Sequence, residues 1–143
     1  MKKKVLFICI HNSARSQMAE EYLRHMAGDV FEVESAGLEP SSINPFVIQV
    51  MQEEGIDLSH KKSQSVFELY KEQKFYGYVI TVCDRAREAD CPIFPGLVKR
   101  LSWDLENPAD FTGTDDEILV RVRAVRDAIK NLVLDFINEY GSM

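Results

Sequence analysis

The chain has 143 residues, 45% of them hydrophobic and 10% aromatic, which is enough apolar material for one hydrophobic core but not for two. Its formal net charge of −6 argues against a broad basic surface that would bind nucleic acid. No apolar run approaches the roughly 20 residues that a membrane span needs, and polar residues follow MKKKVLFICI where a signal peptide would be cleaved. We therefore expect one domain over residues 1–143 in a cytoplasmic monomer that binds neither nucleic acid nor membrane.

The first half of the chain alternates strand and helix patterns. Residues 4–10 form a continuous apolar run, typical of a strand that is buried on both faces of a sheet. Apolar residues then recur at helical spacing between Ser13 and Gly28. Residues 31–37 predict a second strand, and a loop with two prolines leads into a helix over residues 45–54.

The second half continues this alternation. We predict a short helix over residues 65–73, a strand over 76–83, a loop over 84–96 and a short strand over 99–103. A long amphipathic helix follows, whose core face carries Ile118, Leu119, Val122, Val125, Ile129, Leu132, Val133 and Phe136. The predicted fold class is α/β: a three-layer sandwich in which helices flank a central four-stranded parallel sheet.

A segment of the form C-x5-R, CIHNSAR, joins the first strand to the first helix. Such a loop directs backbone N–H groups inward, and the following helix N-terminus favours an anion. We therefore predict that a tetrahedral oxyanion binds the loop formed by Ile10, His11, Asn12, Ser13, Ala14, Arg15 and Ser16. Arg15 can hold two anion oxygens, and the positive field favours the reactive thiolate of Cys9. Ser16 is placed to hydrogen-bond to the sulfur, and Asn12 to order the loop.

These residues predict a cysteine nucleophile that attacks phosphorus or a similar centre. The alternative is that Cys9 is an inert buried cysteine and Arg15 an exposed helix residue. The position of the segment between a strand and a helix argues against that alternative, because ligands of parallel sheets bind beyond the carboxyl ends of the strands. Cys83 is predicted to lie at a second such end.

The other two cysteines, Cys83 and Cys91, flank the charged segment DRAREAD. Their spacing is not that of a zinc site, so we expect no metal there. A disulfide framework would leave one of three cysteines unpaired, which favours a redox pair. The loop could bring Cys83 to the Cys9 sulfur and then let Cys91 attack Cys83. The alternative is that both are unpaired structural cysteines.

The segments VLFICIHNSARSQMAE, VESAGLEP and TVCDRAREADCPIFPG resemble the low-molecular-weight phosphatase fold and, within it, the thioredoxin-coupled arsenate reductases, over essentially the whole chain. The resemblance implies that Cys9 attacks arsenate, with Arg15 and Ser16 as oxyanion and thiolate partners. It also implies that Cys83 attacks the Cys9–arsenic adduct and releases arsenite, after which Cys91 resolves the Cys9–Cys83 disulfide. Thioredoxin then reduces the Cys83–Cys91 disulfide. The spacing of these two cysteines is one residue longer than in the usual family segment, which a loop should tolerate.

One residue of the phosphatase pattern is missing. By resemblance, an aspartate directly before a proline donates a proton to the leaving oxygen, but Asn107 precedes Pro108 in this chain. An amide cannot donate that proton, so Glu106 or Asp104 is the candidate acid, or the step proceeds without one. We expect the change to weaken a phosphatase more than an arsenate reductase, because arsenate exchanges its oxygens with thiols more readily.

The predicted function is therefore arsenate reduction, with arsenate as substrate and thioredoxin as reductant; the sequence leaves open whether glutaredoxin serves instead. One alternative is a low-molecular-weight protein tyrosine phosphatase that uses Cys9 as nucleophile. Another is a noncatalytic protein that binds oxyanions or senses redox state through Cys9. No tightly bound cofactor is expected, although Ser35 is a candidate ligand for a structural monovalent cation found in some relatives.

Overall fold

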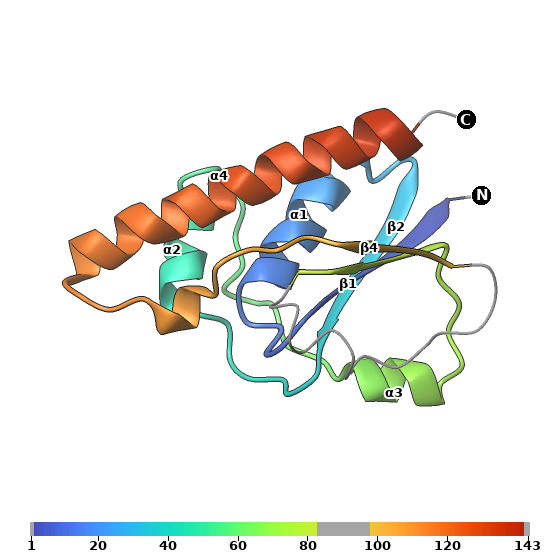
Figure 1. Cartoon of the computed structure of the whole chain (residues 1–143), viewed down its shortest axis with the longest axis horizontal. Coiled ribbons are helices and arrows are strands. Elements are labelled where there is room, and N and C mark those ends of the chain that lie inside the picture. The colour runs from blue at the N-terminus through green and yellow to red at the C-terminus, as the bar shows by residue number, and fades with distance from the viewer. Residues whose placement is uncertain (1, 83–97, 142–143) are drawn as a thin grey trace.

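The computed structural model describes residues 2–82 and 98–141, which form a three-layer α/β fold (Figure 1). Four parallel strands make one sheet in the order β2-β1-β3-β4, so their carboxyl ends meet at the same edge. The strands are β1 Lys3–Cys9, β2 Phe31–Gly37, β3 Tyr78–Thr81 and β4 Lys99–Ser102. The helices are α1 Arg15–Ala27, α2 Pro45–Gln52, α3 Val66–Lys71 and α4 Asp115–Tyr140, with a short 3-10 helix, η2, at Pro108–Asp110.

Helices cover both faces of the sheet, as the alternating sequence pattern predicts. Figure 1 shows α1, α2 and α4 on one face and α3 on the other. The larger hydrophobic cluster lies between the sheet and helices α1, α2 and α4, and it includes Phe31, Ile129 and Phe136. The smaller cluster lies under α3 and includes Leu6 and Leu69. The three-layer α/β fold class is thereby confirmed.

Strand β1 contributes side chains to both hydrophobic clusters. Val5, Phe7 and Cys9 belong to the larger cluster, while Leu6 and Ile8 belong to the smaller one. Because successive side chains of a strand point to opposite faces, burial on both faces requires the continuous apolar run seen in the sequence. This burial fixes the position of Cys9 at the end of the strand.

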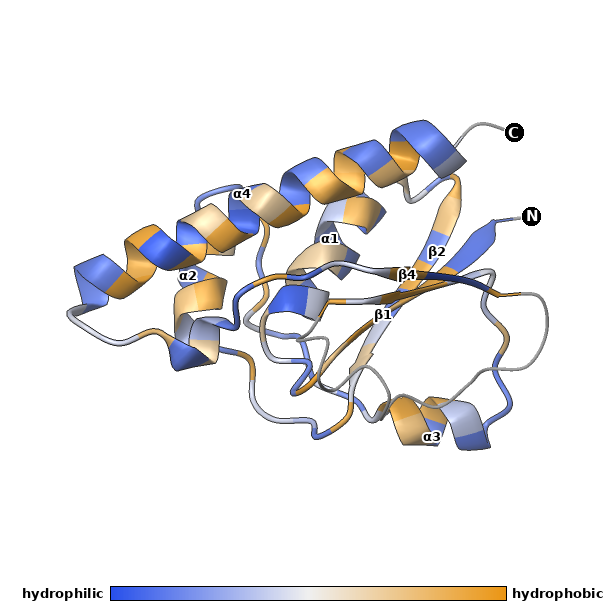
Figure 2. Cartoon of the chain, in the orientation of Figure 1, coloured by the Kyte–Doolittle hydropathy of each residue, from blue (hydrophilic) through white to orange (hydrophobic). Residues whose placement is uncertain are grey.

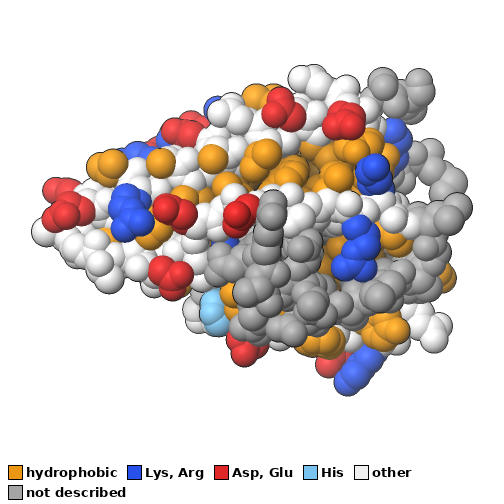
Figure 3. Space-filling view, viewed as in Figure 1, with side chains coloured by type: hydrophobic (Ala, Val, Ile, Leu, Met, Phe, Trp, Pro, Cys, Tyr) orange, Lys and Arg blue, Asp and Glu red, His pale blue; other side chains and the backbone are white. Residues whose placement is uncertain are grey.

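Helix α4 is amphipathic over its whole length (Figure 2). Its buried residues include Leu119, Val122, Ile129, Val133 and Phe136, all predicted for its core face. Its exposed residues carry both charges, and acidic and basic side chains are interspersed over the described residues seen in Figure 3. None of the helices in the described ranges combines the length and apolarity that a membrane crossing demands.

Candidate active site

The segment that joins β1 to α1, residues 10–14, forms a tight loop at the carboxyl edge of the sheet. We call residues 9–16 the Cys9 loop. Its carbonyl groups accept backbone N–H bonds from the chain that follows β2: Leu38 donates to Cys9, Glu39 to Ile10, Ser41 to His11 and Asn44 to Ser13, over 2.7 to 3.2 Å. Four bonds to one segment hold the loop in a single conformation.

Strand β2 ends directly against the Cys9 loop, and only glycine fits at the contact. A Cβ atom on Gly37 would lie 2.7 Å from the Asn12 nitrogen and 2.9 Å from the Ile10 oxygen. Asn12 itself has a left-handed backbone with φ of 51°, which asparagine tolerates better than most residues. The loop therefore depends on two residues whose types suit their backbone positions.

Two hydrogen-bond donors converge on the Cys9 sulfur, which is buried with the residue 2% exposed. The backbone N–H of Asn12 donates to Sγ at 3.2 Å, and Ser16 Oγ lies 2.9 Å from the same atom. The Asn12 side chain in turn donates from Nδ2 to Ser16 Oγ at 2.7 Å. That bond leaves the Ser16 hydrogen free to point at the sulfur. Donors in these positions stabilise the thiolate, which is the nucleophilic form of cysteine.

Arg15 begins α1, and its side chain is almost completely buried with the residue 2% exposed. Its Nη1 donates to the Leu105 carbonyl at 2.9 Å. A guanidinium has five N–H donors, and this carbonyl takes one of them. The bond also attaches the segment after β4, which contains Asn107, to the Cys9 loop. The buried position contradicts the alternative in which Arg15 is an exposed helix residue.

The two candidate acids lie on the surface in the segment after β4. Asp104 and Glu106 are both exposed. Glu106 Oε2 lies 3.7 Å from Arg121 Nη2 on α4. Asn107 is the N-cap of η2, where its Oδ1 accepts the Ala109 backbone N–H at 3.1 Å. Neither carboxylate thus occupies the position before Pro108, and the role of either as an acid stays a prediction.

Three residues behind the Cys9 loop, Gln17, Glu20 and Gln64, were not predicted from the sequence as part of the site. The Asn12 Oδ1 accepts the backbone N–H of Gln64 at 3.0 Å and Gln17 Nε2 at 3.1 Å. Asn12 Nδ2 donates to Ser35 Oγ at 2.9 Å, and Ser35 Oγ donates to Glu20 Oε1. The one signal in the sequence is that Glu20 follows Ser16 by one helical turn, on the same face of α1.

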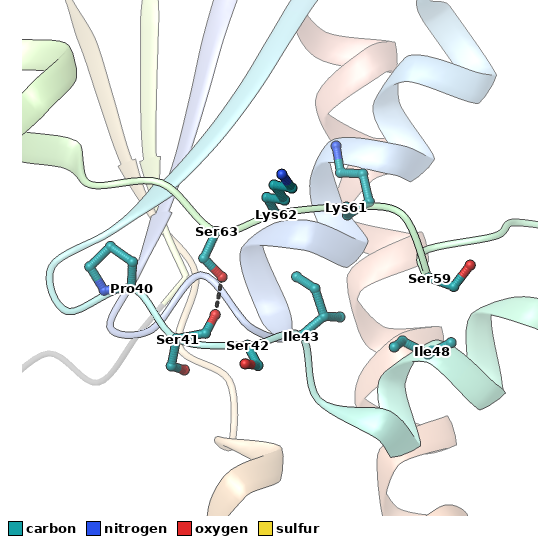
Figure 4. A pocket seen from close by; sticks show the side chains of 9 residues that line it. All are labelled: Pro40, Ser41, Ser42, Ile43, Ile48, Ser59, Lys61, Lys62 and Ser63. Atoms are coloured by element: carbon teal, nitrogen blue, oxygen red, sulfur yellow. Dashed lines mark hydrogen bonds between the residues drawn. The ribbon is translucent and has the colours of Figure 1, made fainter.

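A cavity of about 510 Å³ lies beside this network, and Figure 4 shows its lining. The lining residues are Pro40, Ser41, Ser42, Ile43, Ile48, Ser59, Lys61, Lys62 and Ser63. Ser63 Oγ is hydrogen-bonded to the Ser41 carbonyl, drawn as a dashed line in Figure 4, and lies 2.9 Å from the Asn12 carbonyl. Cys9 does not line this cavity. The cavity instead adjoins Ser41 and Ser63, which form hydrogen bonds to the Cys9 loop.

The relay cysteines Cys83 and Cys91 lie outside the described residues, and so does the predicted loop over residues 84–96. Their roles therefore stay predictions. Among the described residues, no three His, Cys, Asp or Glu side chains gather in a group that could hold a metal ion.

The family model of low molecular weight phosphotyrosine protein phosphatases matches residues 4–141, and the chain belongs to this family. Relatives within it carry the name arsenate reductase. The chain is 40% identical over 129 residues to the arsenate reductase of Shouchella clausii, which covers 90% of both chains.

Two solved structures extend the comparison. An arsenate reductase in its oxidised state is 32% identical, covers 96% of this chain and 98% of its own, and superposes with a TM-score of 0.78. A thioredoxin-dependent arsenate reductase of Corynebacterium glutamicum is 30% identical with a TM-score of 0.65, over 93% of this chain and 62% of its own. The predicted resemblance to the arsenate reductases is confirmed by these relatives.

Proposed function

We propose that this chain is an arsenate reductase in which Cys9 is the nucleophile. The observation that carries the proposal is the convergence of the Asn12 N–H and the Ser16 hydroxyl on the Cys9 sulfur, beside buried Arg15. Arsenate is a tetrahedral oxyanion, and its negative charge suits a guanidinium at the N-terminus of a helix. The arsenate reductases among the relatives support this choice of substrate.

The proposed reaction starts when the Cys9 thiolate attacks the arsenic of arsenate. An S–As bond forms, and one arsenate oxygen leaves as water after protonation. The Cys83 thiolate then attacks the Cys9 sulfur, so an S–S bond forms and the S–As bond breaks. The electron pair of that bond stays on arsenic, which is reduced from As(V) to As(III) and leaves as arsenite.

Cys91 completes the cycle by attacking the Cys83 sulfur. This step releases the Cys9 thiolate and moves the disulfide to Cys83 and Cys91. Thioredoxin, with two thiols of its own, would reduce this disulfide, and the thioredoxin-dependent structure among the relatives supports it as reductant. Because the relay starts from free thiols, we place its action in the reducing cytoplasm.

The test is arsenite production from arsenate in the presence of thioredoxin, thioredoxin reductase and NADPH. Cys9→Ser should abolish turnover because the nucleophile is lost, and Cys91→Ser should allow at most one turnover because the disulfide cannot move on. Replacing thioredoxin with glutaredoxin and glutathione identifies the reductant. Hydrolysis of p-nitrophenyl phosphate is measured in parallel on every variant.

The phosphatase alternative predicts a different pattern, since it requires Cys9 alone. Ester hydrolysis that Cys91→Ser leaves unchanged, together with no arsenite from the wild type, would overturn the reductase proposal. Oxidation of Cys9 without repeated arsenite production, under either reductant, would instead support the redox-sensing alternative.

A further inference from the structure

The sequence suggested a structural monovalent cation at Ser35, but the side-chain oxygens of Ser35, Glu20 and Asn12 already have protein partners. Ser35 Oγ donates to Glu20 Oε1, and Lys61 Nζ lies 2.7 Å from Glu20 Oε2. The Asn12 side-chain oxygen accepts the Gln64 backbone N–H. Glu20 is 5% exposed, so its charge must be balanced locally. The ammonium of Lys61 already supplies Glu20 with the positive charge that a cation from solvent would bring, so the residues present do not fit an additional cation.

We infer that Lys61 is the built-in cation of this site and a positioning residue for the Cys9 thiolate. It acts through a continuous chain of hydrogen bonds from its ammonium to the sulfur, formed in order by Glu20, Ser35, Asn12 and Ser16. The inference rests on the proposed function only because it takes Cys9 as the nucleophile.

The direction of each bond in this chain follows from its neighbours. The backbone N–H of Gln64 can only donate, so the Asn12 oxygen must face it and the Asn12 Nδ2 must face the two serines. Asn12 Nδ2 carries two hydrogens, one for Ser35 Oγ and one for Ser16 Oγ. An ionised carboxylate only accepts, so the Ser35 hydroxyl donates to Glu20.

The direction of donation along these hydrogen bonds also determines which group donates to the Cys9 sulfur. Since Ser16 Oγ accepts from Asn12, its own hydrogen is available for the Cys9 sulfur 2.9 Å away. Lys61 Nζ lies 2.7 Å from the Glu20 carboxylate at the other end of this chain, so its charge acts on the sulfur through the chain. Chains of hydrogen bonds polarise one another in this way inside proteins.

Lys61 belongs to the segment between α2 and α3, and Figure 4 shows its side chain turned toward α1, whereas Lys62 is exposed. Its Nζ also lies 2.8 Å from Glu21 Oε1. Burial raises the pKa of Glu21, but hydrogen bonds and charges of Lys61 and Arg24 outweigh it and hold that pKa below its ordinary value. Arg24, whose side chain is 42% exposed, pairs with both carboxylates, and His25 Nδ1 lies 3.6 Å from Glu21. Lys61 is thus the more buried of the two permanent cations.

The test measures the rate of Cys9 alkylation by iodoacetamide against pH, in a background in which Cys83→Ser and Cys91→Ser leave one thiol. Lys61→Met keeps the apolar stem and removes the charge, and Lys62→Met is the matched control on the adjacent residue. We expect the midpoint pH of the alkylation rate to be the same for the wild type and for Lys62→Met. The Lys61→Met midpoint should rise by about one pH unit, which is about tenfold in thiolate at low pH.

Potassium chloride then distinguishes positioning from a general loss of structure, with choline chloride at the same ionic strength as reference. Potassium should leave the wild type unchanged and partly restore the Lys61→Met midpoint, because a small cation can enter the vacated place. Lys61→Arg should keep most of the wild-type behaviour. A wild-type midpoint that depends on potassium, or a folded Lys61→Met variant with an unchanged midpoint, would overturn the inference.

If Lys61→Met does not fold, Ser35→Ala tests the same chain at another link. It keeps the Lys61–Glu20 pair and breaks the path to Asn12, so the midpoint should rise as well, and an unchanged midpoint would contradict the inference. Alkylation needs neither arsenate nor thioredoxin. An upward shift in a protein that makes no arsenite would therefore refute the proposed function and leave this inference standing.

Discussion

The contact between β2 and the Cys9 loop gives the sharpest test of how the fold positions the nucleophile. In Gly37→Ala the new Cβ would lie 2.7 Å from the Asn12 nitrogen and 2.9 Å from the His11 carbonyl carbon. Both are backbone atoms, which cannot rotate away as the end of a side chain can. Ordinary contacts begin at 3.4 Å, so the loop or the strand must move by about 0.7 Å.

Two consequences follow from that displacement. Overpacking of this kind costs about 1 to 3 kcal/mol of folding free energy. A misplacement approaching 1 Å in the groups that hold the reacting atoms costs about 10²-fold in rate. We therefore expect Gly37→Ala to lose stability in urea denaturation and to make arsenite about a hundred times more slowly.

Gly77→Ala is the matched control, since it adds the same methyl group just before β3. Its Cβ would lie 3.7 Å from the Lys4 carbonyl, which is an ordinary contact. Replacing a glycine also stabilises a protein by about 0.4 to 1 kcal/mol, because the unfolded chain loses conformational entropy. The control should therefore be at least as stable as the wild type. If Gly37→Ala were as stable and as active as Gly77→Ala, the Cys9 loop would not be fixed by β2 and the reasoning would fail.

Three further substitutions test the acid, an ion pair and the core. Asn107→Asp can still cap η2 and supplies the missing acid, so p-nitrophenyl phosphate hydrolysis should rise at least about tenfold; an unchanged rate would mean that this position does not deliver the proton. Glu53 has its pKa lowered to about 2, chiefly by hydrogen bonds from Arg123. Its stabilisation is complete above its ordinary value near 4.5 and is lost as the pH falls toward 2, so melting temperatures of wild type and Glu53→Gln should converge over that range. Phe136→Ala, at a 3% exposed position, should lose about 3 to 5 kcal/mol, whereas Leu134→Ala, 42% exposed, should lose little; equal losses in chemical denaturation would contradict the assigned core.

The parts of the fold that could be predicted are those in which burial leaves a periodic pattern. Strand β1 is buried on both faces, so four consecutive residues from Val5 to Ile8 are fully buried and the strand appears as an unbroken apolar run. The apolar positions of α4 repeat at helical spacing because one side faces the sheet. Strand β3 ends at Thr81, two residues before the predicted boundary, because strand ends depend on partner strands that the sequence does not display.

The candidate site also has a part that local sequence predicts and a part that depends on distant residues. That Cys9, Arg15 and Ser16 lie together could be predicted, because one short loop holds all three. Lys61 reaches Glu20 across 41 positions of sequence, and no local spacing encodes such a pair. What the sequence does contain is a carboxylate one helical turn behind an oxyanion loop, where its charge opposes both the anion and the thiolate. A buried carboxylate in that position requires a compensating cation, and the chain itself provides two: Arg24 at a local helical spacing and the more buried Lys61 from a distant segment.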